Sequence, residues 1–323
     1  MQRRTAAALI ASLPLAWTSW ARAQAWPDKP IRLVVPYPPG ASTDAMGRMV
    51  GQAISGPLGQ TVVVDNRGGA SGNIGSDNVA KSPPDGYHFL LGTDATHAAN
   101  YHLSANPPFH PVKDFTPLTL AALNPIVLVT NPSFTPAANL TELIAYVKAN
   151  PAKGAYGSSG NGSPHHLAGE LLKQRSGAPL THVPYKGGGP AINDLMGGTI
   201  PMVFASLITV MQQIRAGKLR AIVFTQAKRY EGLPDVPTLA ETWPGTEMPS
   251  WLGFFGPANL PPAIAQRMSD EMIKALRSPD VKSKLETAGM VVVASTPAEF
   301  AAQIAREFEQ RGKLIREAGI KLE

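Results

Sequence analysis

Two glycine- and serine-rich segments follow predicted buried strands and open predicted helices, and their residue types suit the binding of an anion. The first is residues 38–44 (PPGASTD), and the second is residues 157–166 (GSSGNGSPHH). The first turn of a helix leaves backbone N–H groups without partners, and the helix dipole adds positive potential there. A carboxylate can therefore bind such a turn without any arginine or lysine. Two such turns facing each other across a cleft would hold a small anion from both ends.

Each segment also has a purely structural interpretation. Ser42 or Thr43 in the first segment, and Ser163 followed by Pro164 in the second, are typical helix-capping residues. Asp44 falls in the first helical turn, where its carboxylate can accept from its own helix, from a ligand amine or from water. For the first segment, the spacing leaves helix capping and anion binding equally open.

The residue pattern disfavours metal chemistry and catalysis. His165 and His166 are adjacent, so on a helix they point about 100° apart and cannot chelate one metal well. We expect His166 to line the cleft and the other histidine to be a surface or capping group. The run GSSGNG is not a nucleophile elbow, and no acid partner for a Ser–His pair is evident. We therefore predict a binding protein with no catalytic residue and no metal, and keep a Ser–His hydrolase as the alternative.

The remaining glycine-rich segments do not predict a cofactor. Residues 184–190 (PYKGGGP) place the lysine before the glycines, unlike a P-loop. Residues 65–75 (DNRGGASGNIG) lack the dinucleotide-binding spacing after the first strand. For residues 184–190 a structural turn and a role at the mouth of the cleft stay equally open, whereas glycines such as those of residues 65–75 more often indicate tight packing.

The elements that carry these segments alternate between short apolar runs and longer amphipathic stretches. Strand–helix–strand spacing of this kind predicts an α/β fold with mostly parallel sheets flanked by helices. Strands are expected at 31–36, 61–65, 88–92, 126–130, 155–158, 182–183, 202–204 and 219–225, the last as a possible return to the first lobe. Helices are expected at 43–54, 73–81, 139–150, 163–175, 190–196, 209–216, 261–278 and 296–318.

The chain length, and the point where the alternation of strands and helices starts again, indicate two lobes. A chain of 323 residues exceeds one ordinary domain. Proline-rich loops occur instead of a flexible tether, so the lobes are expected to be joined by strands. We predict a discontinuous first lobe formed by residues 26–122 and 228–323, a second lobe formed by 123–227, and a ligand cleft between them.

The first 25 residues resemble a secretory signal peptide. Arg3 and Arg4 precede an uncharged apolar stretch, and small residues predict cleavage near Ala23 or Ala25, which implies a periplasmic protein. The segment holds three arginines and no acid, so its removal lowers the formal net charge from +6 to +3. No basic stripe with interleaved aromatic residues is present, which argues against nucleic acid as a partner. Cysteine is absent, so disulfides and thiol chemistry are excluded.

A series of motifs in order resembles the Bug receptors, the substrate-binding proteins of tripartite tricarboxylate transporters. The resemblance covers nearly all of the mature chain. The matching runs are KPIRLVVPYPPG (29–40), DNR (65–67), GNIG (72–75), PDGY (84–87), PVKDF (111–115), SSGNGS (158–163), HLAGE (166–170), HVPYKG (182–187), AGKLRA (216–221) and LPDVPT (233–238).

The resemblance implies a two-lobed, type II-like periplasmic binding protein. It holds a ligand carboxylate at two helix N-termini, largely through backbone groups and water. It also implies a monomer that serves the membrane components of such a transporter, with presentation of ligand to a sensor kinase as an alternative. The expected ligand-binding residues are Tyr37, Pro39, Gly40, Ala41, Ser42, Thr43, Asp44 and Thr93 on one lobe, and Ser158, Ser159, Gly160, Asn161, Gly162, Ser163, His166 and Ala205 on the other.

The chain departs from the family pattern at three places. The family often has two glycines where Gly40 and Ala41 stand, and usually has proline where Gly68 follows Arg67. It often has Asp-Asn after the strand at 202–204, where this chain has Ala205 and Ser206. If that aspartate contacts the amine of amino-acid ligands, its absence predicts a ligand without an amine. An aliphatic or aromatic mono- or dicarboxylate would fit.

Overall fold

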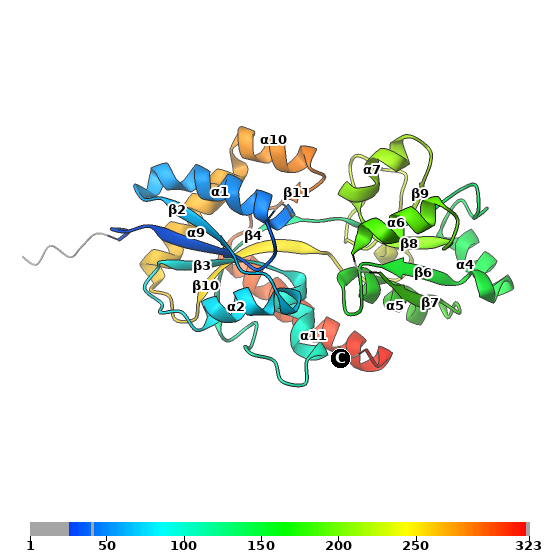
Figure 1. Cartoon of the computed structure of the whole chain (residues 1–323), viewed down its shortest axis with the longest axis horizontal. Coiled ribbons are helices and arrows are strands. Elements are labelled where there is room, and N and C mark those ends of the chain that lie inside the picture. Colours follow the sequence, from blue (N-terminus) through cyan, green and yellow to red (C-terminus); the bar gives the residue numbers. More distant parts are fainter. Residues whose placement is uncertain (1–25, 40–41, 186, 321–323) are drawn as a thin grey trace, which may run out of the picture.

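The strands form two separate sheets, which lie side by side along the length of the molecule (Figure 1). The computed structural model describes residues 26–39, 42–185 and 187–320. The predicted signal peptide at 1–25 therefore lies outside the described residues. The six-stranded sheet has the order β11-β4-β10-β3-β1-β2, and the five-stranded sheet has the order β7-β6-β8-β5-β9.

The strands are β1 (Ile31–Val35), β2 (Val62–Asn66), β3 (His88–Thr93), β4 (Phe115–Leu123), β5 (Ile126–Thr130), β6 (Ala155–Ser158), β7 (Thr181–Pro184), β8 (Met202–Ser206), β9 (Arg220–Phe224), β10 (Trp251–Pro257) and β11 (Val291–Val292). The α-helices are α1 (Ser42–Leu58), α2 (Asn73–Ala80), α3 (Asn100–Leu103), α4 (Leu140–Ala149), α5 (Pro164–Ser176), α6 (Gly188–Met196), α7 (Leu207–Arg215), α8 (Leu239–Thr242), α9 (Pro262–Arg277), α10 (Pro279–Thr287) and α11 (Pro297–Ala318). Short helices of other types are η1 (Ala70–Gly72), η2 (Ala95–Ala99) and η3 (Pro151–Lys153).

The α/β class with helices flanking two sheets is confirmed, but the strand pairing is mixed rather than mostly parallel. In the first sheet β1 pairs parallel with β2 and β3, whereas β10 runs antiparallel to β3 and β4. In the second sheet β6 pairs parallel with β7 and β8, whereas β5 runs antiparallel to β8 and β9. Both β5 and β10 follow a passage from the other sheet, and each runs antiparallel to its neighbours; the short β11 also pairs antiparallel, with β4. A strand that arrives directly from the other lobe need not follow the direction of the βαβ units.

In the described part of the chain, two passages join the sheets. Asn124 and Pro125 join β4 to β5, and the long connection after β9 leads back to the first sheet at β10. The expectation that residues 219–225 return to the first lobe is wrong, because β9 pairs with β5 in the second sheet. The actual return strand β10 is buried along its whole length.

Each sheet has its own apolar core, and α11 contributes to both lobes. Met46 and Val50 of α1 pack with the first sheet, as the helical spacing predicts. The first half of α11 packs against Trp251 and Phe255 through Phe300, whereas Leu314 lies in the cluster that holds the core of the second lobe. Figure 1 shows the red end of α11 beside α5. The boundaries predicted for the two lobes stay predictions. Within the described ranges, no helix is both long and apolar enough to cross a bilayer.

Candidate ligand-binding site

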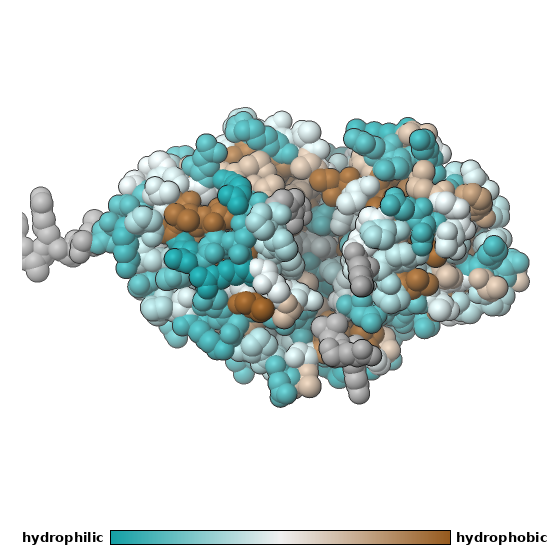
Figure 2. All heavy atoms as spheres, in the orientation of Figure 1, coloured by the Kyte–Doolittle hydropathy of each residue, from teal (hydrophilic) through white to brown (hydrophobic). Residues whose placement is uncertain are grey.

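The strand registers place both predicted ligand loops at the sheet edges where the chain passes between the lobes. In the first sheet β10 starts beside the end of β3, where Leu252 pairs with Thr93, and β1 runs parallel to β3. In the second sheet the end of β8 lies beside the start of β5, where Ser206 pairs with Ile126, and β6 runs parallel to β8. The loops after β1 and β6 therefore both lie on the side of the other lobe. Figure 2 shows the surface hollowed between the two lobes.

The first loop is held by hydrogen bonds among three parallel strands. The Tyr37 hydroxyl lies 2.9 Å from the Thr93 hydroxyl, and Asn66 Nδ2 donates to the Tyr37 carbonyl at 3.2 Å. Burial raises the pKa of Tyr37 to about 12, so its hydroxyl stays protonated and can donate. Pro39 is exposed and Thr43 is buried. Gly40, Ala41 and the side chain of Ser42 lie outside the described residues.

Asp44 is buried and acts within its own lobe. Its carboxylate accepts from Asn66 Nδ2 at 3.0 Å and from Arg48 Nε at 3.1 Å. These contacts fasten the start of α1 to the end of β2. Of the three uses that the sequence leaves open for Asp44, the contact with Arg48 corresponds to accepting from its own helix.

The second loop is shaped by a helix cap and by glycines. Ser163 is the N-cap of α5 and accepts from the His166 N–H at 3.2 Å, with Pro164 in the first turn. This predicted cap is confirmed. Gly160 and Gly162 have φ values of 130° and 70°, which side chains with a Cβ rarely adopt. Ser158 lies inside the loop, where its hydroxyl accepts from the Gly160 N–H at 3.0 Å, whereas Asn161 is exposed.

The two adjacent histidines have different environments. His166 is buried, stacks on His182 at 3.7 Å between ring centroids, and accepts from the Gly162 N–H at 3.0 Å through Nδ1. His165 instead lies against the loop, with Nδ1 2.7 Å from Ser159 Oγ and Nε2 3.3 Å from Ser206 Oγ. The expectation that His165 is a surface or capping group is therefore wrong. Its contact with Ser206, at the end of β8, holds the His165 ring against the loop.

Two polar residues near the loop, Asn124 and Ser206, were not among the expected ligand-binding residues. Asn124 Nδ2 donates to Ser206 Oγ at 3.2 Å, and Ser206 lies near His165. Ala205, the residue that was singled out, is buried in an apolar cluster with Val127. In the sequence, the only signal for Ser206 was its position directly after Ala205, where the family often has Asp-Asn. Its contact with Asn124 depends on the antiparallel register of β5 and β8.

The described residues contain Ser–His contacts but no catalytic arrangement. Ser158 Oγ lies 2.6 Å from His182 Nε2, and Ser159 Oγ lies 2.7 Å from His165 Nδ1. Among the described residues no carboxylate orients either of these histidines. Burial lowers the pKa values of His165 and His182 to about 4, which makes each a weak base. The same part of the chain contains no cluster of three or more His, Asp or Glu side chains that could hold a metal ion.

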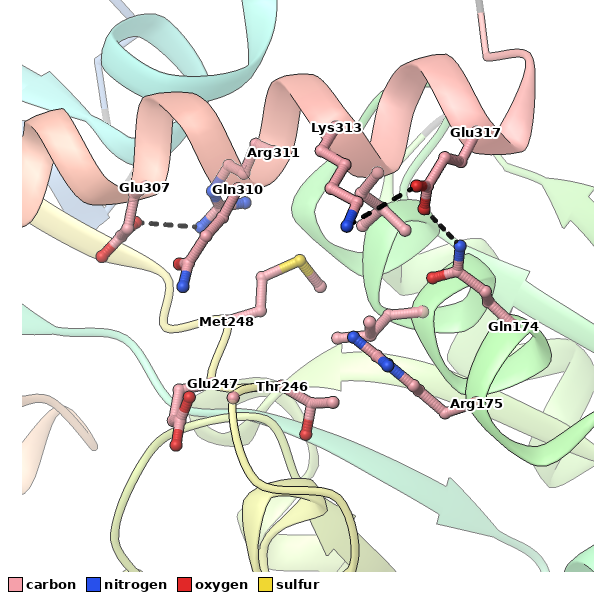
Figure 3. Close-up of a pocket in the computed structure, with 13 residues that line it drawn as sticks. Gln174, Arg175, Thr246, Glu247, Met248, Glu307, Gln310, Arg311, Lys313 and Glu317 are labelled. Carbon is pink, nitrogen blue, oxygen red and sulfur yellow. Dashed lines mark hydrogen bonds and ion pairs between the residues drawn. The ribbon is translucent and has the colours of Figure 1, made fainter.

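A cavity of about 470 Å³ lies away from these loops, between α5, residues 245–248 and α11 (Figure 3). None of the predicted site residues lines it. Several of its polar side chains contact one another: Arg311 contacts Glu307 at 3.4 Å, and Glu317 accepts from Gln174 at 2.5 Å. The cavity is therefore a feature of the passage between the lobes rather than of the predicted site.

Comparison with known proteins identifies the family. The sequence model described as "Tripartite tricarboxylate transporter family receptor" matches residues 46–320. The chain belongs to this family. BugT of Bordetella pertussis is 37% identical over 302 residues, which cover 93% of this chain and 92% of BugT. The receptor is thus a solute-binding protein of the Bug type.

Two solved structures of similar proteins carry dicarboxylates. MatC from Rhodopseudomonas palustris with bound malate is 28% identical to the receptor, with a TM-score of 0.74 over 90% of this chain and 100% of MatC. Rpa4515 of R. palustris with adipate is 34% identical, with a TM-score of 0.77 over 92% of this chain and 99% of the other. The two-lobed fold of the receptor matches both.

The cap at Ser163 gives a first test of the loop. Ser163→Ala is expected to lower the free energy of unfolding by about 1 kcal/mol, because the His166 N–H loses its acceptor. Urea unfolding followed by circular dichroism measures the change. Arg175→Ala, an exposed change later in the same helix, should stay within about 0.5 kcal/mol of wild type. Equal stabilities for the two variants would contradict the capping role.

Proposed function

We propose that this receptor captures a small carboxylate, with a dicarboxylate as the first candidate, for the membrane components of a tripartite tricarboxylate transporter. The observation that carries the proposal is the placement of two strand–loop–helix turns on the facing edges of the two sheets. Each turn opens a helix, where backbone N–H groups favour an anion. The malate and adipate bound to MatC and Rpa4515 support the choice of ligand class.

The side chains around the loops favour a ligand without an amine. The hydroxyl groups of Tyr37, Thr93 and Ser159 lie at the two loops, and none of them carries a charge. Asp44 is engaged with Arg48 and Asn66, and Ala205 offers no carboxylate. An ammonium group would lose its water without gaining a counter-charge, which is unfavourable.

The proposal also covers the location of the protein, its oligomeric state and its lobe boundaries. The receptor is placed in the periplasm after cleavage near Ala23 or Ala25, as a monomer with lobes 26–122 plus 228–323 and 123–227. The ligand-binding residues are those expected at the two loops, together with Thr93. Presentation of ligand to a sensor kinase is the alternative use of the same binding, and it changes the partner but not the site.

A thermal-shift screen over carboxylates tests the function. A bound ligand at about 100 times its dissociation constant stabilises the folded state by about 2.7 kcal/mol, so the melting temperature should rise by several degrees. Adipate and malate are expected to give the shift, whereas adipamide, which has the same length but no charge, should not. Addition of EDTA should leave the shift unchanged.

Mass spectrometry of the bound fraction separates binding from catalysis. The receptor should release the added carboxylate unchanged. A chemical product would instead favour the hydrolase alternative. A full panel of carboxylates without any shift would contradict the proposed function.

A further inference from the structure

Hydrogen-bonded groups connect the second ligand loop to the passage between the lobes. Ser159 Oγ lies 2.7 Å from His165 Nδ1, and His165 Nε2 lies 3.3 Å from Ser206 Oγ. Asn124, which follows β4, donates from Nδ2 to the same Ser206 oxygen at 3.2 Å. A residue of the loop is thus linked to the strand connection through two side chains.

The connection continues from Asn124 to the first ligand loop. The Asn124 N–H donates to the Ser250 carbonyl at 2.8 Å, which ties one passage between the lobes to the other. Ser250 Oγ donates to Asp94 Oδ1 at 2.9 Å. Asp94 follows Thr93, whose hydroxyl lies 2.9 Å from that of Tyr37.

The middle of this connection is firmly anchored. Asp94 and Arg311 are both nearly inaccessible to solvent, and their charged groups lie 3.1 Å apart. Arg311 also donates to the Pro249 carbonyl at 2.6 Å, and it pairs with Glu307, as Figure 3 shows. The connection between the loops therefore runs through a buried, ion-paired centre.

We propose that His165, Ser206 and Asn124 are positioning residues that couple the two ligand loops, so that ligand contacts made at one loop strengthen those at the other. The inference rests on the proposed function, because it takes the two loops to be the binding surfaces. We name the eight residues the loop-coupling chain: Ser159, His165, Ser206, Asn124, Ser250, Asp94, Thr93 and Tyr37.

The distances indicate which link of the loop-coupling chain is the loosest. The two contacts of Ser206 Oγ, at 3.3 Å and 3.2 Å, are the longest of the side-chain contacts in the chain. Typical N–H···O bonds are about 2.9–3.0 Å long, so these contacts can still shorten. The serine hydroxyl can rotate to suit either partner.

A double-mutant cycle measured with adipate tests the coupling. His165→Leu and Thr93→Val are each expected to weaken adipate binding by about three- to tenfold, comparable with the loss of one hydrogen bond. The double variant should be no more than about twice as weak as the weaker single variant, because either change already breaks the chain. His165→Gln, whose amide can donate and accept, should recover at least half of the affinity lost in His165→Leu.

The matched control uses a serine of the same loop that lies outside the chain. Ser163→Ala combined with Thr93→Val should weaken binding by the product of the two single effects, since Ser163 caps α5 and does not join the chain. If the double variant of His165→Leu and Thr93→Val also weakens adipate binding by the product of the two single effects, the two loops are not coupled, although the receptor still binds its ligand.

Amide hydrogen exchange tests the chain without any ligand. Asn124→Ala is expected to raise exchange at residues 159–162 at least threefold, because Ser206 and His165 lose their anchor. Asn150→Ala, which removes an exposed amide that bonds only within its own helix end, should leave this exchange unchanged. Unchanged exchange at 159–162 in Asn124→Ala would overturn the proposal even if adipate did not bind. Raised exchange without adipate binding would overturn the adipate assignment and support the chain.

Discussion

Replacement of Arg311 by methionine is expected to lower the free energy of unfolding by about 3–5 kcal/mol. Arg311 is 2% exposed and faces two carboxylates, Asp94 at 3.1 Å and Glu307 at 3.4 Å. Glu307 also accepts from the indole N–H of Trp251 at 2.8 Å. Methionine fills much of the same volume, so the main cost is that two buried carboxylates lose their cation.

The pH dependence of the variant separates this cause from a packing defect. Burial raises the pKa values of Asp94 and Glu307, and Arg311 opposes that rise. Without Arg311 both pKa values rise further above those of the unfolded chain. The folded variant then binds more protons than the unfolded variant, so its stability grows as the pH falls toward the unfolded-state pKa. The deficit relative to wild type should therefore be smaller at pH 5 than at pH 7.

Urea unfolding at the two pH values measures both effects. Lys313→Met is the matched control, because Lys313 lies in the same helix but its side chain is 72% exposed and its pairing with Glu317 is long, at 3.8 Å. It should change stability by less than about 1 kcal/mol. An Arg311→Met deficit that is independent of pH would assign the loss to packing instead.

The local part of the fold is readable in the sequence. The helical spacing of Ala45, Met46, Met49, Val50 and Ala53 predicts α1. All but the exposed Ala45 do pack in the core of the first sheet. The strand β10 was missed because Gly253, Gly256 and Pro257 interrupt its apolar pattern. Gly253 is needed there, since an added Cβ would lie 2.2 Å from the ring of Phe300. Such a constraint comes from a helix far along the chain and has no local signature.

The candidate site, like the fold, is only partly readable in the sequence. The loops around Asp44 and Ser163 were found because glycine, serine and helix-start signals are local. The roles of His165, Ser206 and Asn124 depend on the pairing of β5 with β8, strands about 80 residues apart. No periodicity reports that pairing. The sequence therefore indicates where an anion could bind, and the structure adds how the two loops are connected.

Replacement of Gly162 by valine is expected to weaken carboxylate binding by more than tenfold. Gly162 has a φ of 70°, where a β-branched residue is strained, and its N–H donates to His166 Nδ1 at 3.0 Å. Relief of strain of about 1–3 kcal/mol would move the loop and disturb the cap at Ser163. Because 1.4 kcal/mol corresponds to about a tenfold change in affinity, even moderate displacement removes much of the binding.

Gly177→Val is the control that carries the same backbone strain at the other end of α5. Gly177 has a φ of 60°, and an added Cβ would meet nothing within 4 Å. Both variants should lose stability in urea, but only Gly162→Val should lose affinity for the carboxylate found in the thermal-shift screen. Isothermal titration calorimetry of the two folded variants measures the difference. If Gly162→Val binds as wild type does, the ligand is held away from this loop, because a strained loop could not keep the same contacts.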